Sequence, residues 1–377
     1  MKNILLIPDS FKGTMSSEEI CSIMDRAIKI HYPDAMVKQI PVADGGEGSV
    51  DAFLQALGGE KKYLTVQGPF GKNMEGFYGV VKKTTAVIEM AACAGLPLVG
   101  DELYPDKTTT YGVGELILDA ARSGCKEIIV GLGGSATNDG GCGAAAACGV
   151  IFRDETGKSF IPTGGTLNAV ASIDCSGLDK ALEHVSITTM CDIDNPFYGK
   201  TGAAYIFGPQ KGANPEMVQI LNANLESLAK VIKRDCKIDV QAIAGSGAAG
   251  GMGGGMAAFF GSHLQMGIET VLDTVNFANL LKSADLVLTG EGKIDSQSLR
   301  GKVVIGVARR AKKANVPVVA VVGDISDDVE GAYEEGVSAI FSINRLAVDF
   351  KIAKTRAHQD MEKTVDNLMR FLKRMGL

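Results

Sequence analysis

The most informative stretch of the chain is the glycine-rich segment Gly131-Leu-Gly-Gly-Ser-Ala-Thr-Asn-Asp-Gly-Gly-Cys-Gly143. The apolar residues 127–130 before it predict a buried strand, and the alanines 144–147 after it predict a helix. Glycines let a backbone approach a ligand closely, and N–H groups at the start of a helix favour an anion. The turn also carries four hydrogen-bonding side chains, Ser135, Thr137, Asn138 and Asp139. We therefore expect this turn to bind a small anionic molecule.

Strand, loop and helix alternate at both ends of the chain. The predicted strands there are 3–7, 36–42, 285–289, 316–322 and 337–341. Short β-like runs between residues 61 and 90 indicate a meander instead. We therefore predict an α/β protein of two domains: a doubly wound parallel sheet built from residues 1–60 and 286–377, and an inserted mixed α/β domain at 61–285.

Charged side chains gather in a second glycine-containing turn, Thr289-Gly-Glu-Gly-Lys-Ile-Asp-Ser-Gln-Ser-Leu-Arg-Gly-Lys302. The turn lies between a predicted strand and a predicted helix, and it mixes acids with Lys and Arg. Phosphoryl transfer needs this mixture, because carboxylates bind Mg²⁺ and cations offset phosphate charge. A solvated loop with a helix cap is the alternative interpretation. Flanking glycines and three similar loops elsewhere favour a functional site.

Several carboxylates directly follow predicted strands, namely Asp9, Asp44, Glu291 and Asp324. In open parallel sheets, ligands bind beyond the carboxyl ends of the strands. We therefore expect several of these acids near one rim of a sheet. Helix capping is an alternative role for Asp44.

The composition is typical of a globular protein, with 46% hydrophobic and 22% charged residues among 377. The formal net charge is −6 and no block of Lys and Arg stands out, so we expect no nucleic-acid partner. We expect no membrane association, because no apolar run approaches the roughly 18 residues of a spanning helix. Residues 1–8 lack a signal-peptide pattern, and the eight cysteines form no C-x-x-C pair, which indicates a cytoplasmic protein.

A second hypothesis comes from Gly245-Ser-Gly-Ala-Ala-Gly250, which matches the dinucleotide-binding fingerprint, with Glu269 at about the right distance. This alternative is an NAD(P)-dependent reductase acting on small hydroxy acids. The segment before Gly245 is not a strongly apolar strand, however, and the glycines continue through Gly255, which a helix tolerates badly. The fingerprint is therefore the weaker of the two signals.

Five stretches together resemble the bacterial type I glycerate kinases, and they occur in the expected order across nearly the whole chain. They are Pro8-Asp-Ser-Phe-Lys-Gly13, Ala43-Asp-Gly-Gly-Glu-Gly48, Gly131-Leu-Gly-Gly-Ser-Ala-Thr-Asn-Asp-Gly140, Cys191-Asp-Ile-Asp-Asn-Pro196 and Thr289-Gly-Glu-Gly-Lys-Ile-Asp-Ser-Gln297. The resemblance implies ATP-dependent phosphorylation of D-glycerate with Mg²⁺, with 2-phosphoglycerate as the favoured product. It also implies a flavodoxin-like domain built from both termini and an inserted domain that resembles restriction endonucleases.

Individual roles are inferred within that resemblance. Lys12 would neutralise a phosphate or the glycerate carboxylate, and Asp192 or Asp295 would orient the attacking hydroxyl and accept its proton. The candidate catalytic residues are Asp9, Lys12, Asp192 and Asp295. The candidate metal ligands are Asp44, Glu47 and Glu291. The candidate substrate or phosphate ligands are Ser135, Thr137, Asn138, Asp139, Arg300 and Lys302. The residues alone leave open the acceptor hydroxyl, the domain that holds ATP, the nucleotide preference and the oligomeric state.

Overall fold

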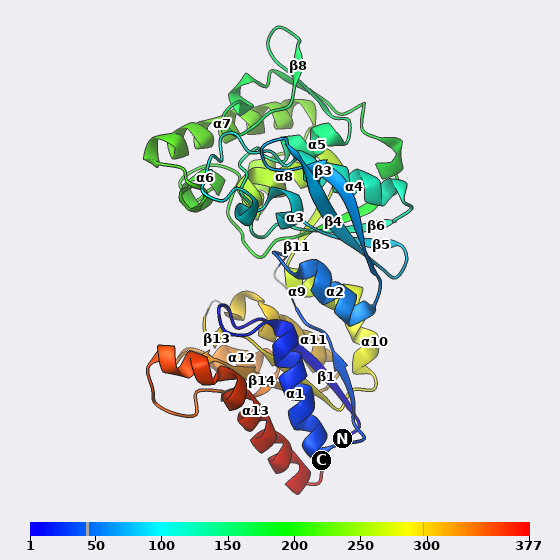
Figure 1. Ribbon diagram of the computed structural model, residues 1–377, viewed down its shortest axis with the longest axis vertical. Helices are drawn as coiled ribbons and strands as arrows, with labels where there is room; N and C mark the ends of the chain where they lie inside the picture. Colours follow the sequence, from blue (N-terminus) through cyan, green and yellow to red (C-terminus); the bar gives the residue numbers. More distant parts are fainter. Residues whose placement is uncertain (43–44, 297) are drawn as a thin grey trace. The chain divides into compact units, whose positions relative to one another are not determined.

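The computed structural model describes residues 1–42, 45–296 and 298–377, and the chain divides into two compact units (Figure 1). Unit 1 comprises Met1–Ala43, Gln55–Leu57 and Ile268–Leu377, and unit 2 comprises Asp44–Leu54 and Gly58–Gly267. Both units are α/β, as predicted. Within the described residues, no helix combines the length and the apolar character needed to cross a membrane.

Unit 1 contains a five-stranded parallel sheet in the order β16-β14-β12-β1-β2. Its elements are β1 (Asn3–Pro8), α1 (Ser17–His31), β2 (Met36–Gln39), α9 (Gly267–Thr274), α10 (Phe277–Leu281), β12 (Leu286–Gly290), β13 (Lys293–Ile294), α11 (Val303–Lys313), β14 (Val318–Val322), β15 (Asp324–Ile325), α12 (Glu330–Glu334), β16 (Val337–Ser342) and α13 (Phe350–Arg374). Ile4 pairs with Leu286 and Ile7 with Thr289. The prediction that both ends of the chain share one sheet is therefore confirmed.

Helices cover both faces of this sheet, which explains its near-continuous apolar strands. Helices α1 and α13 pack against each other and share a core with Ile4 and Leu6 of β1 (Figure 1). Helix α11 contacts β1, β12 and β14, and none of its residues belongs to the core that α1 and α13 share with β1. Helix α1 begins at a capping box in which Ser16 and Glu19 bond each other's backbone N–H groups.

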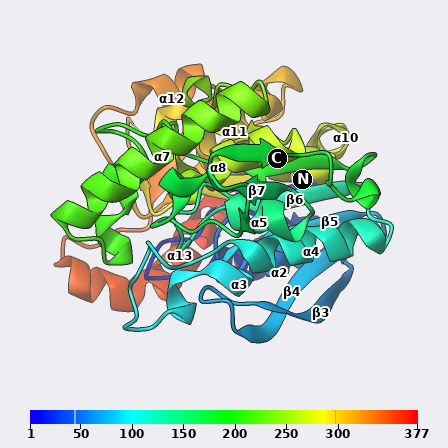
Figure 2. The same ribbon diagram turned by 90° about the horizontal axis from the view of Figure 1, so that it is seen from above.

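Unit 2 is built on a six-stranded mixed sheet in the order β11-β10-β6-β5-β4-β3. Its elements are β3 (Glu60–Gln67), β4 (Asn73–Val81), β5 (Thr85–Glu89), α3 (Ala91–Ala94), α4 (Tyr111–Arg122), β6 (Glu127–Gly131), α5 (Cys142–Ala147), β7 (Ile151–Arg153), β8 (Ser159–Phe160), β9 (Ser172–Asp174), β10 (Ser186–Met190), α6 (Ala203–Phe207), α7 (Pro215–Asp235), α8 (Ala248–Phe260) and β11 (His263–Gln265); α2 (Ser49–Leu57) contributes residues to both units. Strands β3, β4 and β5 form the predicted antiparallel meander, and α4 packs beside β3 and β4 (Figure 2). The other pairs in this sheet are parallel.

The unit boundaries differ from the expected 1–60, 61–285 and 286–377, because residues 268–285 belong to unit 1, whereas Asp44–Leu54 and residues 58–60 belong to unit 2. Helix α9 packs on α11, where Gly306 leaves room for Ile268; a Cβ at Gly306 would lie 2.9 Å from that side chain. Arg310 of α11 also bonds Asp273 of α9 at 2.6 Å. Local periodicity carries no information about which sheet such short helices join.

Candidate active site

The loops after β1 and β12 lie together at the carboxyl edge of the unit 1 sheet. Because these strands are parallel neighbours, they end at the same edge, and the Asp9 N–H donates to the Gly290 carbonyl at 2.7 Å. Glu291 directly follows β12, and the charge of Asp9 acts on it. The structure thus brings Asp9 and Glu291 together at one rim.

Glu291 is a buried acid with an unpartnered oxygen. The residue is 5% exposed, and its Oε1 has no hydrogen-bond partner. Burial raises the pKa of Glu291 to about 7, and the charges of Asp9 and Asp295 push it in the same direction, whereas Ser298 and Lys302 oppose the rise. Because a buried unpartnered carboxylate oxygen is costly, Glu291 is a candidate for binding a cation or for a catalytic role.

The donor chemistry at this rim fits Mg²⁺, which prefers carboxylate oxygens. Glu291 supplies a free buried oxygen, with Asp9 and Asp295 as neighbouring acids. Within the described part of the chain, no three His, Cys, Asp or Glu residues are already gathered as a metal cluster. Of the other expected ligands, Asp44 lies outside the described residues, and Glu47 is an exposed residue of unit 2.

Cations lie in the loops of the same rim. Lys12 is exposed in a tight turn that is closed by the hydrogen bond from Phe11 N to Met15 O at 2.9 Å. Lys302 is exposed at the N-cap of α11, and its charge lowers the pKa of Glu291. The side chain of Arg300 lies outside the part of the chain that the structure describes. Asp295 and Ser298 exchange hydrogen bonds of 3.2 and 3.3 Å, which fixes the turn before α11.

In unit 2, the turn at 45–48 packs on the glycine loop at 131–143. The Gly133 N–H donates to the Gly45 carbonyl at 3.0 Å. A Cβ at Gly131 would lie 2.3 Å from the Gly45 oxygen, so glycine is required for this close approach. Two of the sequence motifs are therefore adjacent in space.

Asp139 holds the glycine loop in shape. The carboxylate is fully buried, and it accepts from Thr110 N at 2.7 Å, Thr110 Oγ1 at 2.9 Å, Gly141 N at 3.1 Å and Gly143 N at 3.2 Å. Burial raises the pKa of Asp139, and these hydrogen bonds oppose the rise. Asp139 thus ties the start of α5 to the residue before α4, and its direct contact with a substrate stays a prediction.

Lys211 is a buried lysine that the sequence did not single out. It ends the short 3₁₀ helix Pro209–Lys211, is 2% exposed, and donates to Ser135 Oγ at 2.8 Å and to the Thr137 carbonyl at 2.6 Å. Burial lowers the pKa of Lys211 to about 7, and the charge of Asp139 opposes the drop. Beside the Thr137 carbonyl that Lys211 contacts, Thr137 Oγ1 and both polar atoms of the Asn138 side chain are buried without hydrogen-bond partners. The only sequence signal was a lysine between glycines in Gly208-Pro-Gln-Lys-Gly212.

Residues 4–373 match the model of the Glycerate kinase family. The chain belongs to the glycerate kinase family. It is 43% identical to a glycerate kinase of Bacillus cereus, covering 97% of this chain and 96% of that protein. It is 44% identical to a glycerate 2-kinase of Escherichia coli, covering 90% of each. A crystal structure from Salmonella typhimurium LT2, provisionally named glycerate kinase 2, superposes with a TM-score of 0.88 at 42% identity, covering 100% of this chain and 99% of that one.

Family membership establishes a kinase, and the reductase alternative finds no support. The segment 245–250 follows a single 3₁₀ turn, Val240–Ala242, whereas the dinucleotide fingerprint requires a strand at that place. Its glycines serve backbone packing instead. Ala249, Gly250 and Gly251 all have positive φ, and a Cβ at Gly250 would lie 2.1 Å from the Thr137 carbonyl oxygen of the glycine loop.

Replacing Gly250 with alanine should therefore displace the glycine loop. A left-handed φ costs alanine about 1–2 kcal/mol, and the overlap with Thr137 adds about 1–3 kcal/mol. Gly124 is the matched control, because its φ is +91° but a Cβ there would meet nothing within 4 Å. Chemical denaturation should show a larger loss of unfolding free energy for Gly250→Ala, together with a kinase activity lowered at least about tenfold. Equal losses in the two variants would contradict the tight packing against Thr137.

Asp192 lies just after β10 in unit 2. Its side chain is exposed, and Oδ1 accepts from the Gly267 N–H at 2.7 Å. The two candidate bases thus belong to different units, since Asp295 is part of unit 1.

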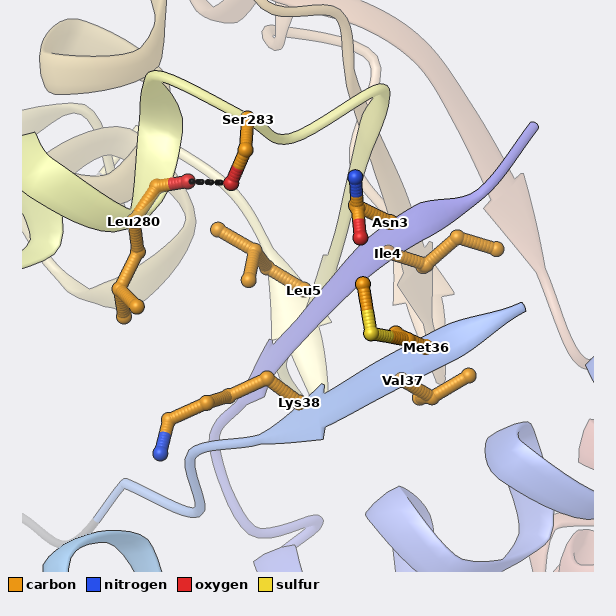
Figure 3. A pocket seen from close by; sticks show the side chains of 8 residues that line it. All are labelled: Asn3, Ile4, Leu5, Met36, Val37, Lys38, Leu280 and Ser283. Atoms are coloured by element: carbon orange, nitrogen blue, oxygen red, sulfur yellow. Dashed lines mark hydrogen bonds between the residues drawn. The ribbon is translucent and has the colours of Figure 1, made fainter.

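A cavity of about 300 Å³ in unit 1 lies away from these residues (Figure 3). Asn3, Ile4 and Leu5 of β1, residues 36–38 of β2, Leu280 and Ser283 line it. Most of these side chains are apolar, and none is a predicted site residue. Asn3 also begins β1, whereas Asp9 follows its carboxyl end. The cavity therefore does not belong to the candidate active site.

Proposed function

We propose that this chain transfers the γ-phosphoryl group of ATP to D-glycerate in the presence of Mg²⁺, with 2-phosphoglycerate as the product. The observation that carries the proposal is the match to the Glycerate kinase family over residues 4–373. Phosphorylation at the 2-hydroxyl is favoured because the relative in Escherichia coli is a glycerate 2-kinase. The eight free cysteines suit a reducing compartment, which favours a cytoplasmic location.

In this proposal, unit 1 carries the phosphoryl-transfer chemistry. Glu291 would hold Mg²⁺ through its unpartnered oxygen, with Asp9 beside it. Asp44 and Glu47 remain candidate ligands. When bound, Mg²⁺ would supply positive charge that offsets the charge on the transferred phosphoryl group.

Cations and a helix terminus would bind the phosphate oxygens. Lys12 and Lys302 are exposed candidates for this role, and Arg300 is a third candidate. Helix α11 begins at Val303, so its first N–H groups are available to an anion. Asp295 or Asp192 would orient the attacking hydroxyl and accept its proton.

The glycine loop of unit 2 would bind the oxyanion groups of the substrates. Ser135 is the best placed of its side chains, because it remains 7% exposed while Thr137 and Asn138 are fully buried. Glycerate offers a carboxylate and two hydroxyl groups, which suit a loop rich in hydroxyl and N–H donors.

The finer fold description is part of the same proposal. Numbered by chain order among the five strands of this sheet, the order β2-β1-β12-β14-β16 becomes 2-1-3-4-5, which is typical of flavodoxin-like sheets. For unit 2, the antiparallel meander joined to parallel strands supports a domain that resembles restriction endonucleases.

The proposed reaction predicts a specific acceptor and a metal requirement. Purified protein with Mg-ATP and D-glycerate should release ADP, and a chelator should stop the release. Lactate should fail as an acceptor because it lacks the hydroxymethyl group, and unpaired polar groups in a site cost affinity. A coupled assay with a panel of small hydroxy acids measures this. Equal rates with lactate and glycerate, or full activity in the chelator, would contradict the proposal.

A further inference from the structure

Lys211 occupies an environment that is unfavourable for a lysine. Lysine is almost never fully buried unless it is paired with an acid, yet Lys211 is 2% exposed and its two hydrogen-bond acceptors are neutral. The acid that acts on it, Asp139, does so by charge, and the Asp139 carboxylate is already bonded to Thr110, Gly141 and Gly143. A lysine kept in such a place at a cost in stability points to a functional task.

The charged form of Lys211 fixes the direction of its hydrogen bond to Ser135. An ammonium group has only donors, so in this form the Ser135 oxygen accepts at the 2.8 Å contact with Lys211 Nζ. The single hydroxyl hydrogen of Ser135 therefore points elsewhere. Within the described residues, Lys211 is the one hydrogen-bond partner of Ser135 Oγ, so this hydrogen is not taken by the protein.

Two backbone hydrogen bonds hold the chain on either side of Ser135. Leu96 N donates to the Gly134 carbonyl at 2.8 Å, and Ala136 N donates to the Ala94 carbonyl at 2.9 Å. Lys211 also donates to the Thr137 carbonyl, which follows in the loop. Ser135 is thus fixed in backbone and side chain before any ligand binds, which is the requirement for a preorganised donor.

We propose that Lys211 is a positioning residue that directs the Ser135 hydroxyl hydrogen toward an oxyanion of a substrate. The glycerate carboxylate and a nucleotide phosphate share that chemistry. Lys211 itself touches Ser135 and Thr137, and it acts on the ligand through Ser135. This inference rests on the proposed function of the glycine loop. A hydroxyl that accepts from a cation is also a stronger donor, so the loss of Lys211 weakens the bond even where Ser135 remains.

The test is a double-mutant cycle on the full chain with the variants Lys211→Met, Ser135→Ala and the two combined. Each single change should raise the KM of one substrate about tenfold or more, which is typical for loss of a hydrogen bond to a charged group. The double variant should be no worse than the poorer single variant, because both changes remove one interaction. Thermal midpoints should stay at or above the wild-type value for Lys211→Met, since methionine removes a buried amine.

Lys230→Met is the matched control, because Lys230 is an exposed lysine of α7 that pairs with Glu226. It should keep wild-type KM values. Measuring the KM for D-glycerate and for ATP separately distinguishes the carboxylate from the phosphate. Unchanged KM values for both substrates in Lys211→Met, or effects of the two changes that simply add, would overturn the proposal.

Two further measurements keep the test decisive. If Lys211→Met does not fold, Ser135→Ala alone decides: a raised KM supports the donor role of Ser135, and an unchanged KM for both substrates overturns it. Calorimetric binding of D-glycerate and of ADP gives the same comparison without turnover. A wild-type protein that turns over no D-glycerate contradicts the proposed function, whereas an active wild type with insensitive variants contradicts only the role of Lys211.

Discussion

Glu291→Gln should lower kcat at least about a hundredfold while the protein stays folded, because a preorganised charge in phosphoryl transfer contributes about 3 kcal/mol or more. Glutamine keeps the size of the side chain but loses the negative charge that would hold Mg²⁺. The expected loss belongs to kcat, and it should not be restored by raising the concentration of D-glycerate. Steady-state kinetics over a range of Mg²⁺ concentrations measures it.

The stability of the same variant gives an independent readout. Burial raises the pKa of Glu291 to about 7 from its ordinary value of 4.5. The folded state therefore binds this proton more tightly than the unfolded state, so the free energy of unfolding falls as the pH rises through this interval and the loss is complete above about pH 7. In a chelator at about pH 8, the Tm of Glu291→Gln should equal or exceed that of the wild type.

Glu335→Gln is the control for this experiment, because Glu335 is a surface acid of unit 1 that pairs with Arg309. Its kcat should match the wild type, and its Tm should change little. If Glu291→Gln were as active as Glu335→Gln, Glu291 would have no part in the reaction and the metal site would lie elsewhere.

Lys12→Ala should lower kcat/KM about a hundredfold with an unchanged Tm. Lys12 is exposed in the turn closed by Phe11 and Met15, so its side chain has little packing to lose. An exposed charge with no role in the reaction would change stability by less than about 0.5 kcal/mol and leave kinetics untouched. Kinetics and thermal unfolding of the same preparation separate these cases.

Lys354→Ala is the matched control for Lys12, because Lys354 is an exposed lysine of α13 whose Nζ lies near Gly13 in the same turn. It should retain wild-type kcat/KM. If Lys12→Ala and Lys354→Ala had the same kcat/KM, Lys12 would contribute no more to the reaction than another positive charge near the turn after β1. Its assigned role would then be wrong.

The sequence predicted the parts of the fold that local pattern controls. Strands β1 and β12 are apolar almost throughout because helices cover both faces of their sheet, and such runs between glycine turns are recognisable without a structure. The strand, glycine loop and helix at 127–147 also appear as predicted, as β6, the loop and α5. Asp9 and Glu291 lie together because parallel strands end at one edge, which the strand pattern alone implied.

The remaining features depend on contacts between residues that are distant in the chain. Lys211 lies 76 residues after Ser135, and one lysine between glycines does not reveal its burial. The glycines of 245–250 satisfied a ligand-binding pattern, but in the structure they admit the backbone of the glycine loop. Glycines in a sequence indicate that the backbone approaches another group closely. Only the fold shows whether that group is a ligand or another segment of the same chain.

The most direct test of the proposed reaction follows both products by phosphorus NMR in one sample of protein, Mg-ATP and D-glycerate. We expect one phosphate ester to appear for each ADP formed, with the coupling pattern of a phosphate on carbon 2 of glycerate, and no ester when D-glycerate is omitted. ADP that forms without any ester of glycerate would contradict the proposal that this chain is a D-glycerate kinase, and an ester on carbon 3 would contradict the proposed product.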